Sequence, residues 1–390
     1  MEPERPSRAG TARLDSNEAC MMPATGFLPR SAFDRLIGAL VQAGYRCVGP
    51  QVRDGTIIYD TLQATRDLPY AIRDQQQPGS YRLEDSDAAR CFAWANGPQA
   101  LKPLLFRPHE VLWQAQRHAN GSLRFLPATA DAERVAVIGA RACDLAALRL
   151  HDQHFLESTV VDPGYQARRA GLFLVAVHCT HPADTCFCAS TGDGPRATQG
   201  FDLALSEQDD GFLVEAGSEA GERIAARLPL ESASAAKSQA ADAEIDAAAR
   251  RQTRRLPSRD LRDALFARLE HPRWQAVAER CLACGNCTSV CPTCFCHREQ
   301  DEPALNGNTS SHTRDWDSCF IQGHSYIHGL TVRADTRTRY RQWLTHKLGG
   351  WHDQYGRSGC VGCGRCISWC PVGIDLTEEV AALLGEAAHG

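Results

Sequence analysis

Two runs of cysteines with the same spacing carry the strongest chemical signal in the chain. Both runs read C-x2-C-x2-C-x3-C-P and contain, in order, Cys281, Cys284, Cys287 and Cys291, then Cys360, Cys363, Cys366 and Cys370. Two-residue gaps bend a backbone around an inorganic cube, so that the first three thiolates of a run can bind three irons of one cluster. The fourth cysteine lies too far along for its own loop and crosses to the other cluster.

The spacing therefore predicts two [4Fe–4S] clusters with crosswise ligands. The first cluster takes Cys281, Cys284, Cys287 and Cys370, and the second takes Cys360, Cys363, Cys366 and Cys291. Within the runs, Gly285, Gly362 and Gly364 are expected to let the backbone approach the inorganic core, where a side chain would collide.

Two other uses of such cysteines fit less well. Zinc sites also begin with C-x2-C, but zinc takes four ligands per ion and gives no reason for eight cysteines in a doubled pattern that ends in proline. Disulfide frameworks belong to small secreted chains, and cysteines spaced so closely in series pair poorly.

Length, charge and composition narrow the class of protein. The chain has 390 residues, which is enough for two or three domains, and its net charge of −5 gives no case for binding nucleic acid. No stretch approaches the roughly 20 apolar residues that a membrane span needs. Eighteen cysteines without an export signal indicate a reducing compartment, so a cytoplasmic protein is expected.

The first 26 residues are polar and contain several prolines, which predicts a flexible arm over 1–26. Met21 and Met22 leave open where translation begins.

An α/β domain is predicted over 27–256. A helix is expected from Ser31 to Gly44, and the apolar stretches 134–139 and 172–177 are typical of buried strands. The helical segment 141–150 between them predicts a βαβ unit with parallel strands, and 201–205 with 211–215 predicts a hairpin. The Gln- and Pro-rich stretch 66–97 indicates irregular structure.

The remaining segment, 257–390, is predicted to be a mainly helical, expanded ferredoxin-like domain. Apolar residues recur at helical spacing before Cys281, and an aromatic stripe from Tyr340 to Tyr355 lies within the 68 residues, 292–359, that separate the two runs. Asp375 is expected to cap a final helix.

Further cysteines suggest a third metal site in two alternative forms. One form joins Cys143 and Cys179, which follow the two buried strands, to Cys186 and Cys188 at the carboxyl edge of the sheet, where α/β folds place ligands. The other form brings the Cys186-Phe-Cys188 loop together with its repeat, Cys294-Phe-Cys296. An iron–sulfur cluster, a zinc ion and plain buried thiols all remain open, and Cys319 belongs to the same set.

Signals for bond-making chemistry are missing. The sequence has no paired metal-binding histidines, no G-x-G-x-x-G after a strand, no P-loop and no recognisable nucleophile arrangement. Electron transfer without catalysis is therefore the expected activity.

Several stretches together resemble the β-subunit family of cytoplasmic [NiFe] sulfhydrogenases, in which the electron-transfer subunits of anaerobic sulfite reductases are relatives. They are Cys281-Leu-Ala-Cys-Gly-Asn-Cys-Thr-Ser-Val-Cys-Pro-Thr-Cys-Phe-Cys296, Arg339-Tyr-Arg-Gln-Trp343, His346-Lys-Leu348, the segment 359–375, Thr185-Cys-Phe-Cys-Ala-Ser190, 200–205 and 139–147. The chain departs from the family at Ala142, where proline is usual, and at Thr191, where methionine is usual. The resemblance covers most of the chain from about Phe27.

This resemblance implies a relay subunit. A family member lies between a flavin subunit that exchanges hydride with NAD(P)H and a catalytic subunit, which is a nickel–iron hydrogenase or, in the alternative, a siroheme sulfite reductase. A flavin converts hydride pairs into single electrons, which iron–sulfur clusters can carry. An iron–sulfur redox sensor without electron flux is a third hypothesis, although the sequence contains no DNA-binding or signalling motif.

Overall fold

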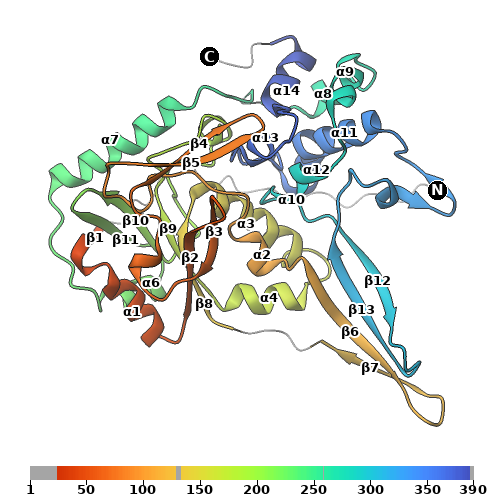
Figure 1. Cartoon of the computed structure of the whole chain (residues 1–390), viewed down its shortest axis with the longest axis horizontal. Coiled ribbons are helices and arrows are strands. Elements are labelled where there is room, and N and C mark those ends of the chain that lie inside the picture. The colour runs from red at the N-terminus through yellow and green to blue at the C-terminus, as the bar shows by residue number, and fades with distance from the viewer. Residues whose placement is uncertain (1–23, 129–132, 258, 387–390) are drawn as a thin grey trace, which may run out of the picture.

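The computed structural model describes residues 24–128, 133–257 and 259–386 (Figure 1). Its largest element is a seven-stranded sheet in the order β1-β11-β10-β9-β8-β2-β3. The strands are β1 (Ala24–Pro29), β11 (Gly211–Ala216), β10 (Leu203–Gln208), β9 (Leu172–Val177), β8 (Val135–Ala140), β2 (Arg46–Arg53) and β3 (Thr56–Thr61). The four central strands, β10, β9, β8 and β2, run parallel, whereas β1, β11 and β3 are antiparallel to their neighbours.

Both faces of the sheet are buried, which explains the continuous apolar runs of its central strands. Along β8, Ala136 and Ile138 belong to the core on one face, and Val137 and Ala140 belong to the core on the other. Helices α1 (Asp34–Gln42) and α6 (Glu219–Ala225) cover the first face. Helices α2 (Lys102–Leu105), α3 (Ala142–Phe155) and α4 (Pro163–Ala170) cover the second.

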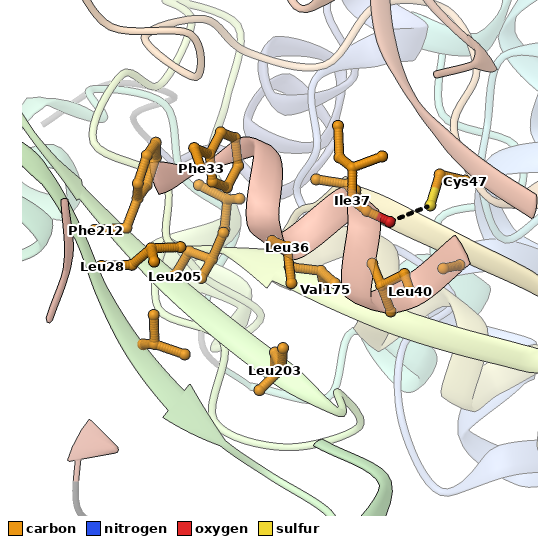
Figure 2. Packing of buried hydrophobic residues seen from close by; sticks show 14 of the residues in the cluster. Leu28, Phe33, Leu36, Ile37, Leu40, Cys47, Val175, Leu203, Leu205 and Phe212 are labelled. Carbon is orange, nitrogen blue, oxygen red and sulfur yellow. Dashed lines mark hydrogen bonds between the residues drawn. The ribbon is translucent and has the colours of Figure 1, made fainter. Parts of the chain in front are cut away.

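Helix α1 shows how spacing becomes packing. Leu36, Ile37 and Leu40 are all buried in the core; in Figure 2 Leu36 and Leu40 point towards the strands that carry Val175 and Leu203, whereas Ile37 projects from the side of the helix near Cys47. The predicted helix, βαβ unit and hairpin are all present, with α3 and α4 between the parallel strands β8 and β9.

The predicted arm and the irregular stretch need correction. Residues 1–23 and the two candidate start methionines lie outside the described residues, but Ala24 to Gly26, assigned to the arm, belong to strand β1. The stretch 66–97 contains the hairpin of β4 (Ile72–Gln77) and β5 (Ser80–Asp85). In β4 the buried side chains of Asp74 and Gln76 alternate with exposed side chains, which is the period of a strand, although every one of these residues is polar.

The longest described helix, α7 (Ala235–Arg251), packs beside β10 and precedes the C-terminal part. The C-terminal part contains short helices around the two cysteine runs. They are α8 (Arg262–Phe266), α9 (Arg273–Arg280), α10 (Asn286–Ser289), α11 (Thr336–Thr345), the π-helical η4 (His346–Gly350), α12 (Trp351–Tyr355), α13 (Arg365–Ser368) and α14 (Leu376–Leu384). The aromatic stripe forms α11, η4 and α12 as a continuous helical segment, with Tyr340, Trp343 and Trp351 buried. Asp375 caps α14 by accepting the backbone N–H of Thr377.

The prediction of a mainly helical C-terminal part missed a hairpin. Strands β12 (His297–Pro303) and β13 (Thr309–Trp316) join β6 (His109–Arg117) and β7 (Leu123–Pro127) in an antiparallel sheet in the order β12-β13-β6-β7. This sheet extends away from the body at the lower right of Figure 1. It takes strands from both sides of the expected boundary at 256/257, so that boundary stays a prediction.

The smaller elements are η1 (Arg30–Ala32), η2 (Thr65–Asp67), α5 (Cys188–Thr191), η3 (Gln322–Ser325), β14 (Tyr326–Ile327) and β15 (Leu330–Thr331). Within the described residues, none of the helices has the length and apolarity needed to cross a lipid bilayer.

Candidate iron–sulfur sites

The first cysteine run begins where α9 ends. Buried Trp274 and Val277 hold α9 against the helical core, and Cys281 follows its last residue. The chain then turns through Ala283 and Gly285, whose φ values of 52° and 78° are left-handed. This turn lets Ala283 donate its backbone N–H to Cys281 Sγ at 3.4 Å. Hydrogen bonds of this kind stabilise a thiolate and help to set the potential of a cluster bound to it.

Cys370 from the second run reaches the same place. A hollow that is partly open to solvent has five cysteines in its lining: Cys281, Cys284, Cys287, Cys366 and Cys370. Phe320, Tyr340 and Trp343 supply apolar wall. Ile374 donates its backbone N–H to Cys370 Sγ at 3.3 Å. The four cysteines expected to share the first cluster thus line one apolar hollow, with Cys366 beside them.

The other four cysteines of the two runs also lie together. Burial is the main cause that raises the pKa of Cys366 well above its usual value, and the neighbouring thiolates of Cys360, Cys363 and Cys291 raise it further. Burial likewise raises the pKa of Cys360 to about 12. Buried thiols of this kind lose their protons readily only when a metal binds the sulfur or a fixed cation lies beside it.

Lys347 places such a cation among the sulfurs. Its side chain is buried, with 4% of the residue exposed, and Nζ donates to Cys291 Sγ at 3.5 Å and to Thr293 Oγ1 at 3.0 Å. Burial alone would lower the pKa of Lys347, but the surrounding thiolates, Cys291 first, raise it well above its usual value. The ammonium therefore stays charged. Nothing in the spacing of the sequence singled out this lysine.

The glycines of the second run have a different role from the one expected. A Cβ on Gly362 would lie 2.5 Å from the Cys188 backbone, and one on Gly364 would lie 2.4 Å from the Thr185 carbonyl oxygen. Both have left-handed φ values, of 65° and 71°. The close approach is therefore between two protein backbones. It is fixed by the Phe187 N–H, which donates to the Gly362 carbonyl at 2.8 Å.

A third group of thiols lies across that contact. Cys143 is in the first turn of α3 after β8, and Cys179 follows β9, so both stand at the carboxyl edge of the sheet. After burial, which is the largest cause, the thiolates of Cys188 and Cys179 raise the pKa of Cys186. Burial is also the main cause that raises the pKa of Cys143, and the charges of Asp144, Cys363 and Cys188 raise it further. The sheet-edge version of the third site is the one whose four cysteines come together.

This third group adjoins the second. Cys186 Sγ lies 3.8 Å from the Cys363 carbonyl oxygen. Arg365 and Asp144, each 1% exposed, form a buried ion pair at 2.7 Å in the same region. Asn96, which the sequence did not indicate, donates to Asp144 at 2.7 Å and to Cys143 Sγ at 3.7 Å.

The alternative third site, made of the two Cys-Phe-Cys loops, is not assembled. Cys294 lies beside Cys291, and Cys296 lies beside Cys319 and His324, whereas Cys186 and Cys188 belong to the sheet-edge group. The two Thr-Cys-Phe-Cys segments therefore lie in two separate groups of thiols.

The spacing of the thiols bears on what they can hold. Over the described ranges, no three His, Cys, Asp or Glu side chains converge closely enough for a single metal ion. A cubane cluster spreads its ligands around four irons, so wider groups of four sulfurs in apolar hollows fit a cluster better than a zinc ion.

Comparisons with known proteins agree with this geometry. Residues 280–374 match a family model described as a 4Fe-4S dicluster domain. The chain is 30% identical over 284 residues to sulfhydrogenase 2 subunit beta of Pyrococcus furiosus, an alignment that covers 70% of this chain and 79% of the relative. No solved structure matches the chain. The chain carries an iron–sulfur dicluster domain and belongs to the family of sulfhydrogenase beta subunits.

Proposed function

We propose that this chain is the electron-transfer subunit of a cytoplasmic [NiFe] hydrogenase complex. It relays electrons between a flavin subunit that uses NAD(P)H and the catalytic subunit, and it has no catalytic residue of its own. The observation that carries this proposal is the membership of the family together with the grouping of the eight cysteines of the dicluster domain into two sets of four.

The ligands follow the crosswise pattern. Cys281, Cys284, Cys287 and Cys370 hold one [4Fe–4S] cluster, and Cys360, Cys363, Cys366 and Cys291 hold the other. When bound, such clusters accept and release one electron at a time, and a flavin partner separates the two electrons of a hydride.

A third iron–sulfur cluster belongs to the same proposal. Cys143, Cys179, Cys186 and Cys188 hold it at the sheet edge, so that the α/β domain, 27–256, contributes one cluster and the dicluster domain, 257–390, contributes two. The support is the direct backbone contact between the 185–188 loop and the second cysteine run.

The surroundings of these sites combine apolar walls with buried positive charges. The aromatic residues around the first hollow exclude water, and the buried cations Lys347 and Arg365 offset the negative charge of thiolate-bound iron. At one end Cys284 is exposed and Leu282 is 63% exposed. This end of the first site is where a partner protein can approach an electron carrier without crossing a thick layer of protein.

The test is an anaerobic affinity purification of the full chain from native cells, with metals and flavin counted in the recovered complex. Nickel and flavin that co-purify with at least roughly twelve irons per copy of this chain, beyond those of the partners, are the expected result for three or more cubane clusters. Mutating Cys366 to serine should remove iron and interrupt NAD(P)H-linked hydrogen turnover, while the flavin subunit should still reduce artificial acceptors.

Other outcomes would move the assignment. Siroheme without nickel would identify a sulfite reductase relay, and the recovery of an iron–sulfur protein without partners would favour a sensor. Turnover of NAD(P) or hydrogen by the isolated chain would contradict a pure relay.

A further inference from the structure

The turn that follows the first cysteine run forms a separate pocket. Phe295 stacks on His154 with ring centroids 3.8 Å apart and contacts Trp351 at 5.5 Å, which anchors the turn. Its neighbours, Cys294 and Cys296, line a hollow with about 930 Å³ of empty space, part of it open to solvent. Neither sulfur belongs to the three groups assigned above.

Two further donors reach the same hollow from the segment after β13. The Cys296 thiol hydrogen bonds both the Cys319 thiol and the His324 imidazole. Cys319 and His324 also line the cavity. Asp317 ties this segment to the turn, because its backbone N–H donates to the Cys296 carbonyl at 2.9 Å.

The histidine is oriented as a ligand would be. His324 Nδ1 lies 2.7 Å from Asp317 Oδ2, and the carboxylate is itself buried, with 8% of the side chain exposed. A carboxylate on one ring nitrogen fixes the tautomer and leaves Nε2 free to bind a metal, the arrangement that metal-binding histidines nearly always show.

The chemistry of the donors selects the class of ligand. Thiolates with one imidazole favour zinc, copper(I) or iron–sulfur clusters over hard cations. In the described part of the chain no three such donors converge as tightly as one ion requires, whereas the hollow is large. Lys347, which also lines it, supplies a positive charge for a thiolate-bound cluster.

We propose that Cys294, Cys296, Cys319 and His324 hold an additional iron–sulfur cluster, a [4Fe–4S] centre with three thiolate ligands and one imidazole ligand. The site uses none of the cysteines assigned to the three groups, although it adjoins two of them, and it does not depend on which partner proteins the chain binds. Its nearest neighbours are Cys291, which contacts Cys294, and Cys287, whose thiolate acts on Cys319.

The test uses the full chain, reconstituted anaerobically with iron and sulfide, with iron, zinc and sulfide counted per chain. Cys319→Ser should lose about four irons relative to the unmodified chain, in keeping with one cubane cluster. Cys47→Ser is the matched control, because Cys47 is a buried thiol in the core of the large sheet whose sulfur donates to the Ile37 carbonyl, and it should lose none. A loss of one zinc and no iron would overturn the proposal, as would an unchanged metal content.

A second variant guards against misfolding. His324→Cys keeps a ligand in place, so the iron count should stay the same while the potential of one centre falls, because imidazole ligands hold iron–sulfur potentials above those of all-thiolate sites. The shift is followed by anaerobic redox titration with electron paramagnetic resonance. Spectra and potentials identical to those of the unmodified chain would show that His324 is not a ligand and would overturn the proposed donor set. Because these readouts concern metal content and spectra, they can fail while the relay function stands.

Discussion

Replacing Lys347 by methionine should lower the reduction potential of the proposed second cluster by about 100 mV. Methionine keeps the length and apolar body of the side chain but removes the buried charge next to Cys291. An added electron on the cluster is then no longer attracted by an ammonium, so the reduced form becomes less stable.

The magnitude follows from the position of the charge. Nζ lies 3.5 Å from Cys291 Sγ, and an electron shared over the cluster has its centre about twice as far away, at roughly 7 Å. With an effective dielectric constant of about 20, the attraction is about 2.4 kcal/mol. Since about 59 mV corresponds to 1.4 kcal/mol for one electron, the loss equals about 100 mV. Because nearby thiolates raise the pKa of Lys347 well above its usual value, its contribution should not change between about pH 6 and pH 9.

The assay is an anaerobic redox titration monitored by electron paramagnetic resonance. Lys237→Met is the matched control, since Lys237 lies over the Phe27 ring at 3.7 Å, near the N-terminal edge strand, and should leave every potential unchanged. If Lys347→Met shifts the second potential by less than about 20 mV, or shifts it upward, the charge does not act on that cluster and the reasoning fails.

Four further outcomes test the packing and the metal content. Gly362→Ala should destabilise the fold by several kcal/mol because a Cβ would meet the 185–188 loop at 2.5 Å, whereas Gly356→Ala, also left-handed but in open space, should cost about 1 kcal/mol; anaerobic thermal unfolding compares them. Asp144→Asn breaks a fully buried ion pair and should cost about 3–5 kcal/mol, while Asp60→Asn at an exposed pair should scarcely change the melting temperature. Burial lowers the pKa of His151 to about 3, so from pH 6.5 downward the unfolded chain binds a proton that the folded chain refuses; stability should fall by up to about 1.4 kcal/mol per pH unit, and His151→Leu should flatten that slope in denaturant titrations. Removing iron with a chelator under anaerobic conditions should lower the melting temperature and expose the apolar hollow to a hydrophobic dye; an unchanged melting temperature would show that the clusters contribute nothing to the fold.

Sequence patterns predicted the elements whose structure depends on residues close to one another in the chain. The apolar runs 134–139 and 172–177 became parallel strands because both faces of the sheet are covered, and the spacing of Leu36, Ile37 and Leu40 became the buried face of α1. Cys370 of the second run lines the same hollow as the first three cysteines of the first run, while the assignment of ligands to clusters stays a prediction.

Long-range pairing was the part that sequence patterns could not reveal. Strand β13 is polar, and its burial depends on β6, which lies about two hundred residues earlier, so its own composition gave no strand signal. The same limit hid the positions of Lys347 and His324. Lys347 lies within the predicted aromatic helix and His324 in a polar segment, and neither stretch shows by its composition that the fold places the side chain beside sulfur.

The three groups of thiols lie next to one another, and their closeness accounts for the way in which the two parts of the chain are joined. The sheet-edge group contacts the second group through Cys186 and the Cys363 carbonyl, and Cys366 faces the hollow of the first group. The rate of electron transfer falls steeply as the distance between carriers grows, so a relay works best when its domains are held at fixed contacts rather than joined by a flexible linker. The glycines at 362 and 364 are what allow two backbones to meet there, and the antiparallel sheet of β12, β13, β6 and β7 holds the same two parts of the chain together from the other side. A protein that needed its clusters only as independent structural supports would have no reason to fix them in this way.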